Sequence, residues 1–129
     1  MNVFFIDNDH AMNRYHEIIL AETAGRQNVS LSFSDNPIQA LKLLGDEDPF
    51  PCVIFLDINM PLMDGWEFLE TYGQSDFPQD VAIVILTTSR NPEYKERADQ
   101  IDLVAAYKTK PMDVGYFEEI VGTYCRGER

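Results

Sequence analysis

The chain has 129 residues and a formal net charge of −12, with 45% hydrophobic and 25% charged residues. That length suffices for one globular domain with a sizeable core, so we expect a single domain over residues 1–129 with no output domain. So acidic a surface repels nucleic-acid phosphates and anionic membrane headgroups, and we expect neither as a partner.

The start of the chain and its two cysteines indicate the cellular location. The first predicted strand begins almost at Met1, so no signal peptide is expected, and no apolar run approaches the length of a membrane span. Cys52 and Cys125 form no metal or redox motif. We therefore predict two reduced thiols in a cytoplasmic protein.

The chain opens with a short, continuous apolar run at residues 3–6, which predicts a strand buried on both faces. Asn8 or Asp9 can cap the following helix, which we expect to extend to about Thr23. Residues 29–34 then alternate apolar and polar side chains with a period of two, as in an edge strand. The buried face of the helix is expected to contain Ala11, Tyr15, Ile18 and Ile19.

The central strand is predicted at residues 52–56, an apolar run that ends at Asp57. Two prolines bracket this segment, and proline does not fit inside a central strand. The preceding helix begins at Asn36-Pro37, a cap followed by proline at the first helical position. That helix is expected to bury Ile38, Leu41, Leu43 and Leu44.

The second half of the chain continues the alternation of strands and helices. Asp64-Gly65 is a turn into a helix with Trp66, and residues 81–86 predict another buried strand, which ends at Thr87. The remaining predicted elements are a helix from Pro92 to about Ile101, a strand at residues 103–107 and a helix after Asp113.

Five strand–helix repeats predict an α/β fold with parallel strands and right-handed crossovers. We expect a three-layer, doubly wound, five-stranded sheet of flavodoxin-like type, with strand order 2-1-3-4-5. In this order the carboxyl ends of four strands lie side by side, at the edge where open α/β sheets bind their ligands.

Polar side chains gather at that edge. Each alone has an ordinary interpretation as a helix cap, a turn residue or a solvated lysine. Together, carboxylates, a hydroxyl group and an ammonium group are what Mg²⁺ and a phosphoryl group require. The set is Asp7, Asn8, Asp9, Asp57, Asn59, Thr87, Thr88 and Lys110.

These groups predict phosphoryl chemistry. A carboxylate can act as a nucleophile and form an acyl phosphate. Mg²⁺ bound by the acid cluster and Asp57 would offset the repulsion between these carboxylates and an incoming phosphoryl group. Lys110 would hold one phosphoryl oxygen as a point charge, and Thr87 could hydrogen-bond another.

Five segments carry a family resemblance: Ile6-Asp7-Asn8-Asp9, Leu56-Asp57-Ile58-Asn59-Met60-Pro61, Met63-Asp64-Gly65, Leu86-Thr87 and Tyr107-Lys108-Thr109-Lys110-Pro111. From Val3 to Tyr124 the chain resembles a stand-alone, CheY-like response-regulator receiver domain of bacterial two-component signalling. The resemblance implies a phosphoprotein of a phosphorelay, in which Asp57 accepts a phosphoryl group from a sensor histidine kinase or a histidine phosphotransfer protein. It implies no enzyme beyond self-phosphorylation and autodephosphorylation.

The resemblance also implies individual roles. Thr87 moves onto the phosphoryl group, Tyr107 turns inward with it, and Lys110 contacts it. The Lys110–Pro111 peptide is typically cis in the family. The implied Mg²⁺ ligands are Asp7, Asn8, Asp57 and the backbone carbonyl of Asn59, with Asp9 as a further candidate.

An unnamed downstream protein is expected to bind the surface of the fourth helix, fifth strand and fifth helix, which changes when the phosphoryl group shifts the population of the switch. The residues predicted on that surface are Arg90, Tyr94, Lys108 and Phe117. His10 and His16 lie on the first helix, where we expect no chemical role for either.

Asn8 departs from the family pattern, which usually has a metal-binding carboxylate there. Loss of one charge about 4 Å from a dication weakens the interaction by roughly 1 kcal/mol in a water-like dielectric and by more in a buried site. We therefore predict weaker Mg²⁺ binding than in a typical receiver, unless Asp9 compensates.

Two other classes of protein remain open at this point. A receiver fold that works by docking alone is supported by Asn8 but opposed by the presence of Asp57, Thr87 and Lys110. A haloacid-dehalogenase-like phosphatase would use Asp7 as nucleophile and Asp9 as general acid. The immediate start of a helix after Asp9 argues against the phosphatase.

Overall fold

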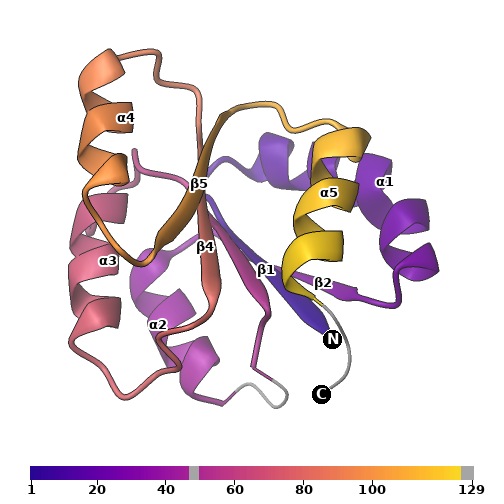
Figure 1. Cartoon of the computed structure of the whole chain (residues 1–129), viewed down its shortest axis with the longest axis horizontal. Helices are drawn as coiled ribbons and strands as arrows, with labels where there is room; N and C mark the ends of the chain where they lie inside the picture. Colours follow the sequence, from indigo (N-terminus) through magenta and orange to yellow (C-terminus); the bar gives the residue numbers. More distant parts are fainter. Residues whose placement is uncertain (47–49, 126–129) are drawn as a thin grey trace.

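The computed structural model describes residues 1–46 and 50–125, in which strands and helices alternate (Figure 1). The elements are β1 (Asn2–Ile6), α1 (His10–Arg26), β2 (Ser30–Ser34), α2 (Pro37–Gly45), β3 (Val53–Leu56), α3 (Gly65–Gly73), β4 (Ala82–Thr87), α4 (Pro92–Asp99), β5 (Val104–Thr109) and α5 (Val114–Tyr124).

The strands form one parallel sheet in the order β2-β1-β3-β4-β5, which confirms the predicted α/β fold. In the register of this sheet, Ile6 pairs with Leu56, and Leu56 pairs with Ile85. The residues that directly follow Ile6, Leu56 and Ile85 therefore lie side by side at the carboxyl edge of the sheet. The strands β2 and β5 are the two edges of the sheet.

Helices cover both faces of the sheet, with α1 and α5 on one side and α2, α3 and α4 on the other (Figure 1). Alternate residues of each central strand enter opposite cores, which is why these strands are apolar without interruption. In β3, for example, Ile54 and Leu56 pack with α2 and α3, whereas Val53 and Phe55 pack with α1 and α5. Within the described residues, no helix has the length and apolar character needed to cross a membrane.

Each helix begins at an Asp or Asn whose side chain accepts a hydrogen bond from a backbone amide of the first turn. Such caps satisfy amide groups that have no partner within the helix. The cap of α3 is reciprocal, because Asp64 and Glu67 each accept from the other's backbone amide. The caps are Asp9, Asn36, Asp64, Asn91 and Asp113.

The predicted buried face of α1 is wrong for Ala11, Tyr15 and Ile18, although Ile19 packs against the core. The helix is also one turn longer than predicted, to Arg26. Tyr15 and Ile18 are 46% and 62% exposed, while His16 and Leu20 are buried. The buried stripe runs through His16, Leu20, Thr23 and Ala24 at helical spacing, so polar residues occupy half of it. In α2, Ile38 and Leu43 are likewise exposed, and Ala40 and Leu44 are buried.

Cys52 and Cys125 form a disulfide, so the prediction of two reduced thiols is wrong. Their Cα atoms lie 5.4 Å apart although 73 positions separate them in the sequence. The bond joins the segment before β3 to the end of α5, two places that the sequence does not show to be neighbours. The cytoplasmic location stays a prediction.

Trp66 connects α3 with α4. Its ring meets Tyr94 edge-on at a centroid distance of 5.7 Å, and the guanidinium of Arg97 lies 4.4 Å from the ring centroid. Trp66 is 8% exposed and packs in the core beneath α3.

Candidate functional site

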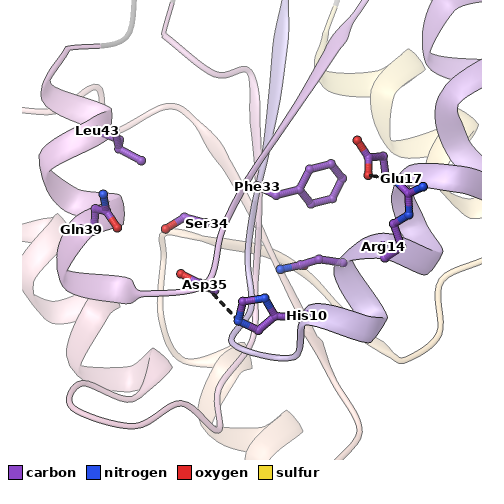
Figure 2. Close-up of a pocket in the computed structure, with 9 residues that line it drawn as sticks. His10, Arg14, Glu17, Phe33, Ser34, Asp35, Gln39 and Leu43 are labelled. Carbon is purple, nitrogen blue, oxygen red and sulfur yellow. Dashed lines mark hydrogen bonds and ion pairs between the residues drawn. The ribbon is translucent and has the colours of Figure 1, made fainter.

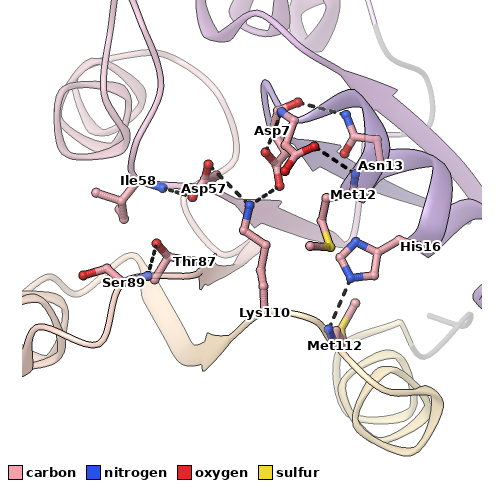
Figure 3. A network of polar contacts seen from close by, with 11 residues as sticks. Asp7, Met12, Asn13, His16, Asp57, Ile58, Thr87, Ser89, Lys110 and Met112 are labelled. Atoms are coloured by element: carbon pink, nitrogen blue, oxygen red, sulfur yellow. Dashed lines mark hydrogen bonds and ion pairs between the residues drawn. The ribbon is translucent and has the colours of Figure 1, made fainter.

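Asp7, Asp57 and Lys110 meet at the carboxyl edge of the sheet (Figure 3). The Lys110 ammonium lies 2.6 Å from Oδ2 of Asp7 and 3.5 Å from Oδ2 of Asp57. All three residues are at least 92% buried, because Asp7 is 4%, Asp57 5% and Lys110 8% exposed. Two buried carboxylates therefore share one cation.

Asp57 follows β3 directly, and burial raises the pKa of its carboxyl group to about 6. The neighbouring Asp7 charge raises the pKa further, whereas Lys110 and the backbone amides of Ile58 and Asn59 lower it. Oδ1 of Asp57 accepts the Ile58 amide hydrogen at 2.8 Å. The Ile58 amide thus fixes the position of the Asp57 carboxylate, while Lys110 is the one cation that Asp57 shares with Asp7.

Gly65, the first residue of α3, lies against the backbone of this segment. A Cβ atom there would be 2.7 Å from the carbonyl oxygen of Asp57 and 2.6 Å from Cδ1 of Ile58. The Gly65 amide donates to the Ile58 carbonyl at 2.8 Å. Only glycine allows this close approach, which fixes the loop after β3.

Lys110 is placed by β4 and β5. Its backbone amide donates to the carbonyl of Thr87 at 2.8 Å, and the Lys110–Pro111 peptide is cis, as the family resemblance implies. Thr87 ends β4, is fully buried, and accepts the Ser89 amide hydrogen through Oγ1 at 3.2 Å. Both residues thus lie at the same edge as Asp57 (Figure 3).

Asp7 is fixed by two contacts that sequence reasoning did not identify. Its Oδ1 accepts the Asp9 amide hydrogen at 2.9 Å, and its carbonyl accepts from Nδ2 of Asn13 at 2.8 Å. The Asp9 carboxylate is exposed and caps α1 through the Met12 amide at 3.1 Å. Asp9 is therefore engaged as a cap, and Asn8 is the half-buried neighbour of Asp7.

His16 is a second residue that the sequence analysis undervalued. It is 1% exposed, and Nε2 accepts the Met112 amide hydrogen at 3.2 Å (Figure 3). Burial lowers the pKa of the imidazole to about 4, with Asp7 raising it and Lys110 lowering it less strongly. The neutral ring thus ties α1 to the loop two residues beyond Lys110.

The oxygens at this edge suit a magnesium ion. Asp7 and Asp57 are buried beside a single ammonium group, so a further positive charge would offset the carboxylate charge that Lys110 leaves uncompensated. Within residues 1–46 and 50–125, no group of three or more His, Cys, Asp or Glu side chains is arranged to hold a metal. An ion would therefore depend on two carboxylates and on neutral oxygens of Asn8 and Asn59.

The predicted partner surface is only partly accessible. Arg90 is exposed, and Tyr94 and Lys108 are half-buried, but Phe117 is fully buried. Phe117 packs in the core beneath α5, so its prediction as a surface residue is wrong. Burial raises the pKa of Tyr107, which packs beside the core on the α4 side of the sheet.

A separate pocket of about 480 Å³ lies between α1, the end of β2 and α2 (Figure 2). His10 reaches into its rim and lies 2.9 Å from Oδ2 of Asp35. Both side chains are largely open to solvent, at 79% and 45% exposure. His10 thus contacts Asp35 at the surface, in a pocket that Asp57 does not line.

Strand order and buried charges together define a flavodoxin-like α/β domain with one polar site at its carboxyl edge. The chain belongs to the response regulator receiver domain family, whose model matches residues 3–121. It is thus a receiver domain of two-component signalling, as the resemblance implied, and not a haloacid-dehalogenase phosphatase.

Solved structures agree with this assignment. A CheY-like receiver domain protein from Methanospirillum hungatei is 29% identical, with a TM-score of 0.75 and coverage of 97% of this chain and 94% of that one. A two-component response regulator from Cytophaga hutchinsonii has a TM-score of 0.83 at 24% identity, over 97% and 96% of the chains. The receiver domain of a sensor histidine kinase from Pseudomonas aeruginosa, which has a magnesium ion in its active-site cleft, has a TM-score of 0.79 at 16% identity, over 98% of each chain.

One curated relative is a hybrid signal transduction histidine kinase E from Dictyostelium discoideum, 39% identical over 66 residues. The match covers 51% of this chain and 4% of that protein, so the chain spans only a small part of the relative's length.

Proposed function

We propose that this receiver domain accepts a phosphoryl group on Asp57 from a phosphohistidine of a sensor histidine kinase or histidine phosphotransfer protein. The observation that carries the proposal is the buried carboxylate of Asp57 at the end of β3, with the Lys110 ammonium between it and Asp7. The domain is a signalling acceptor and not an enzyme that turns over a separate substrate.

In the proposed transfer, an Asp57 carboxylate oxygen forms a bond to phosphorus as the donor's nitrogen–phosphorus bond breaks. The electron pair of the broken bond returns to the imidazole. Lys110 is 3.5 Å from Asp57 and stabilises the charge on the phosphoryl oxygens. Thr87 is the hydroxyl at the same edge that reorients onto the product, with Tyr107 following it.

Magnesium supplies electrostatic stabilisation and alignment of the phosphoryl oxygens when it is bound. Asp7, Asp57, Asn8 and the Asn59 carbonyl are the groups that would hold it. Asn8 is neutral, so it would bind Mg²⁺ more weakly than a carboxylate would. Asp9 does not replace it, because the Asp9 carboxylate is engaged as the cap of α1.

An apolar surface of this domain lies near the Asp57 site, where the phosphoryl donor could bind. A hollow of about 270 Å³ is lined by Ala11, Met12 and Tyr15 of α1 and by Pro111, which follows Lys110. Tyr15 is 46% exposed, so α1 presents apolar surface close to the reacting carboxylate. A helical histidine donor that packs there would bring its phosphoryl group to the edge of the sheet.

The test is intact-mass spectrometry after incubation with acetyl phosphate and Mg²⁺, beside an Asp57→Ala control. One phosphoryl adduct is expected on the parent protein. It should be absent from the control and from samples without Mg²⁺. Adduct formation on Asp57→Ala would contradict the assignment of Asp57.

The second candidate function is a docking module that takes no phosphoryl group, and Asn8 beside Asp7 is the observation in its favour. No adduct at any Mg²⁺ concentration, in a parent protein that remains folded, would support this alternative.

A further inference from the structure

The ion pair between Lys110 and Asp7 joins two parts of the chain that are not neighbours in the sheet. The Lys110 ammonium lies 2.6 Å from Oδ2 of Asp7, across 103 positions of sequence. Asp7 follows β1 and Lys110 follows β5, and β3 and β4 lie between these two strands. Strand pairing therefore does not join β1 to β5 directly, and another element is needed to fix the two residues against each other.

Helix α1 contacts the backbone on both sides of this ion pair (Figure 3). Nδ2 of Asn13 donates to the carbonyl oxygen of Asp7 at 2.8 Å. Nε2 of His16 accepts the Met112 amide hydrogen at 3.2 Å. Asn13 and His16 are three positions apart, so they lie on the same face of the helix. One helix thus holds both Asp7 and the residue two positions after Lys110.

The backbone around Lys110 is held at two points. The Lys110 amide donates to the carbonyl of Thr87 at 2.8 Å, and the Met112 amide donates to His16. Pro111 alone separates Lys110 from Met112, and the proline ring fixes the φ angle of that residue. A displacement of Met112 would therefore be passed to Lys110 and to its ammonium group.

The contact between His16 and Met112 is buried. Each of the two residues is 1% exposed. The imidazole stacks on the Phe5 ring at a centroid distance of 5.6 Å and an interplanar angle of 27°. Phe5 and Met112 both belong to the apolar core between the sheet and α1 and α5. Loss of the acceptor would thus leave a buried amide hydrogen with no partner, which costs free energy.

The imidazole of His16 provides an acceptor that an apolar side chain would not. A leucine or methionine could pack against Phe5, but neither offers a strong acceptor to the Met112 amide. Burial lowers the pKa of His16 to about 4, so the ring is neutral at pH 7 and Nε2 is free to accept. The ring hydrogen then lies on Nδ1. The hydrogen bond, and not the packing, is therefore what a histidine adds here.

We propose that His16 is a positioning residue for the phosphoryl transfer, which acts through the Met112 amide to hold the Lys110 ammonium between Asp7 and Asp57. Misplacement of a catalytic group by about 1 Å can slow a reaction by about 10²-fold, so a contact two residues from Lys110 can govern the rate. The inference rests on the proposed function, because it assigns the support of the cation that faces the phosphoryl group in that reaction.

The first measurement is made by NMR on the parent protein. The nitrogen chemical shifts of the His16 ring are expected to show a neutral tautomer with its hydrogen on Nδ1. A correlation spectrum of the lysine ammonium groups should contain a protected Lys110 signal, because burial and the contact with Asp7 slow its hydrogen exchange. A His16 ring with its hydrogen on Nε2, or a charged ring at neutral pH, would overturn the proposal whether or not any variant folds.

Two substitutions separate the hydrogen bond of His16 from its packing. His16→Leu keeps an apolar side chain in the core without the acceptor, and it should slow formation of the Asp57 adduct with acetyl phosphate by about tenfold or more. His16→Gln retains an acceptor and should restore the rate to within about threefold of the parent. The Lys110 ammonium signal should lose its protection in His16→Leu and regain it in His16→Gln. Parent-like rates and spectra in His16→Leu would overturn the positioning role.

Thr23→Val is the matched control on the same helix. Thr23 is 3% exposed and lies on the buried face of α1, where its hydroxyl accepts a hydrogen bond from Arg26 at 3.2 Å. It lies about two turns beyond His16, so this substitution should change the adduct rate by less than about twofold even if it lowers the stability. Equal slowing in Thr23→Val and His16→Leu would show that loss of stability, and not the position of Lys110, controls the rate.

The same samples separate failure of this inference from failure of the proposed function. A parent protein that forms no adduct would refute Asp57 as the phosphoryl acceptor, and the Lys110 ammonium spectra would still decide whether His16 positions that lysine. An adduct on the parent, formed at equal rates in all the variants, would refute the positioning role alone.

Discussion

At the carboxyl end of the sheet, Asp7, Asp57 and Lys110 are all withdrawn from water, and two like charges share one cation. At the opposite end, a disulfide joins the segment before β3 to the end of α5. The first arrangement costs stability, since buried charges lose hydration. The second restricts the unfolded chain and contributes stability. Strand β3 connects the two ends. The destabilising cluster of buried charges therefore follows a strand that the disulfide holds at its other end.

The largest effect is expected when the shared cation is removed. Lys110→Met should lower the free energy of unfolding by about 3–5 kcal/mol, because it leaves two buried carboxylates without their partner. Urea denaturation at neutral pH measures the change. Lys108→Met, on the same strand but outside the carboxylate cluster, is the control. A loss of similar size in both variants would show that Lys110 does not stabilise the protein through its contacts with Asp7 and Asp57.

Opening the disulfide should have the next largest effect. Cys125→Ser removes a bond that closes a long loop, and a loss of about 2–4 kcal/mol is expected. Cys52→Ser and the double variant should give the same value, and a reducing agent should bring the parent protein to that level. Parent and variants of equal stability under oxidising conditions would mean that the bond does not form in solution.

The carboxyl end should become more stable when its charge is reduced. Asp57→Asn should raise the free energy of unfolding by about 2 kcal/mol at neutral pH, because burial and Asp7 disfavour the Asp57 carboxylate. The measurement is urea denaturation without Mg²⁺. An unchanged or lower stability would contradict the picture of an electrostatically costly site. Asp64→Asn, at an exposed cap, serves as the comparison.

His16 should make the stability depend on pH with a defined sign. Its pKa is about 4 in the folded protein and near 6.5 when unfolded, so the unfolded state binds more protons between these values. Stability is therefore lost as pH falls, by about 2 kcal/mol between pH 7 and pH 5. His16→Gln keeps an acceptor without titrating, and its unfolding curves should show a correspondingly smaller loss.

The smallest effect concerns the metal. Asn8→Asp should tighten Mg²⁺ binding by about tenfold, which corresponds to roughly 1.4 kcal/mol from one added charge. Titration of the protein with Mg²⁺, followed by NMR, measures the affinity. Asp9→Asn should change it little, because Asp9 is occupied as the cap of α1. No change in Asn8→Asp would remove Asn8 from the site.

The fold was predictable because the central strands are buried on both faces and alternate with capped helices. The apolar run alone predicts strand β3 and the position of Asp57 directly after it, and the strand order then brings Asp7 and Lys110 to the same edge. The buried face of α1 was not predictable by hydrophobicity, because His16 and Thr23 occupy it while Tyr15 and Ile18 face solvent. Hydrophobic periodicity predicts a buried stripe only where the buried residues are apolar. His16 is buried because its imidazole accepts a hydrogen bond from the backbone amide of Met112, which is distant in the sequence.

The contacts that shape the site depend on distant partners for the same reason. His16 contacts Met112, 96 positions away, and Cys52 bonds to Cys125, 73 positions away, so both contacts depend on tertiary structure. Asn13 contacts the carbonyl of Asp7 from the first turns of α1, a local contact that its spacing alone did not reveal. Sequence patterns thus located the reactive groups, whereas the groups that hold them in place required the structure.

Trp66 is the single tryptophan of the chain, and it touches Tyr94 and Arg97 of α4. Its fluorescence therefore reports on one helix pair, with no competing indole signal. The stacked guanidinium and the buried ring make the emission sensitive to any displacement of α4 from α3. The domain thus contains its own optical probe, with which a displacement of α4 can be followed in real time without a label.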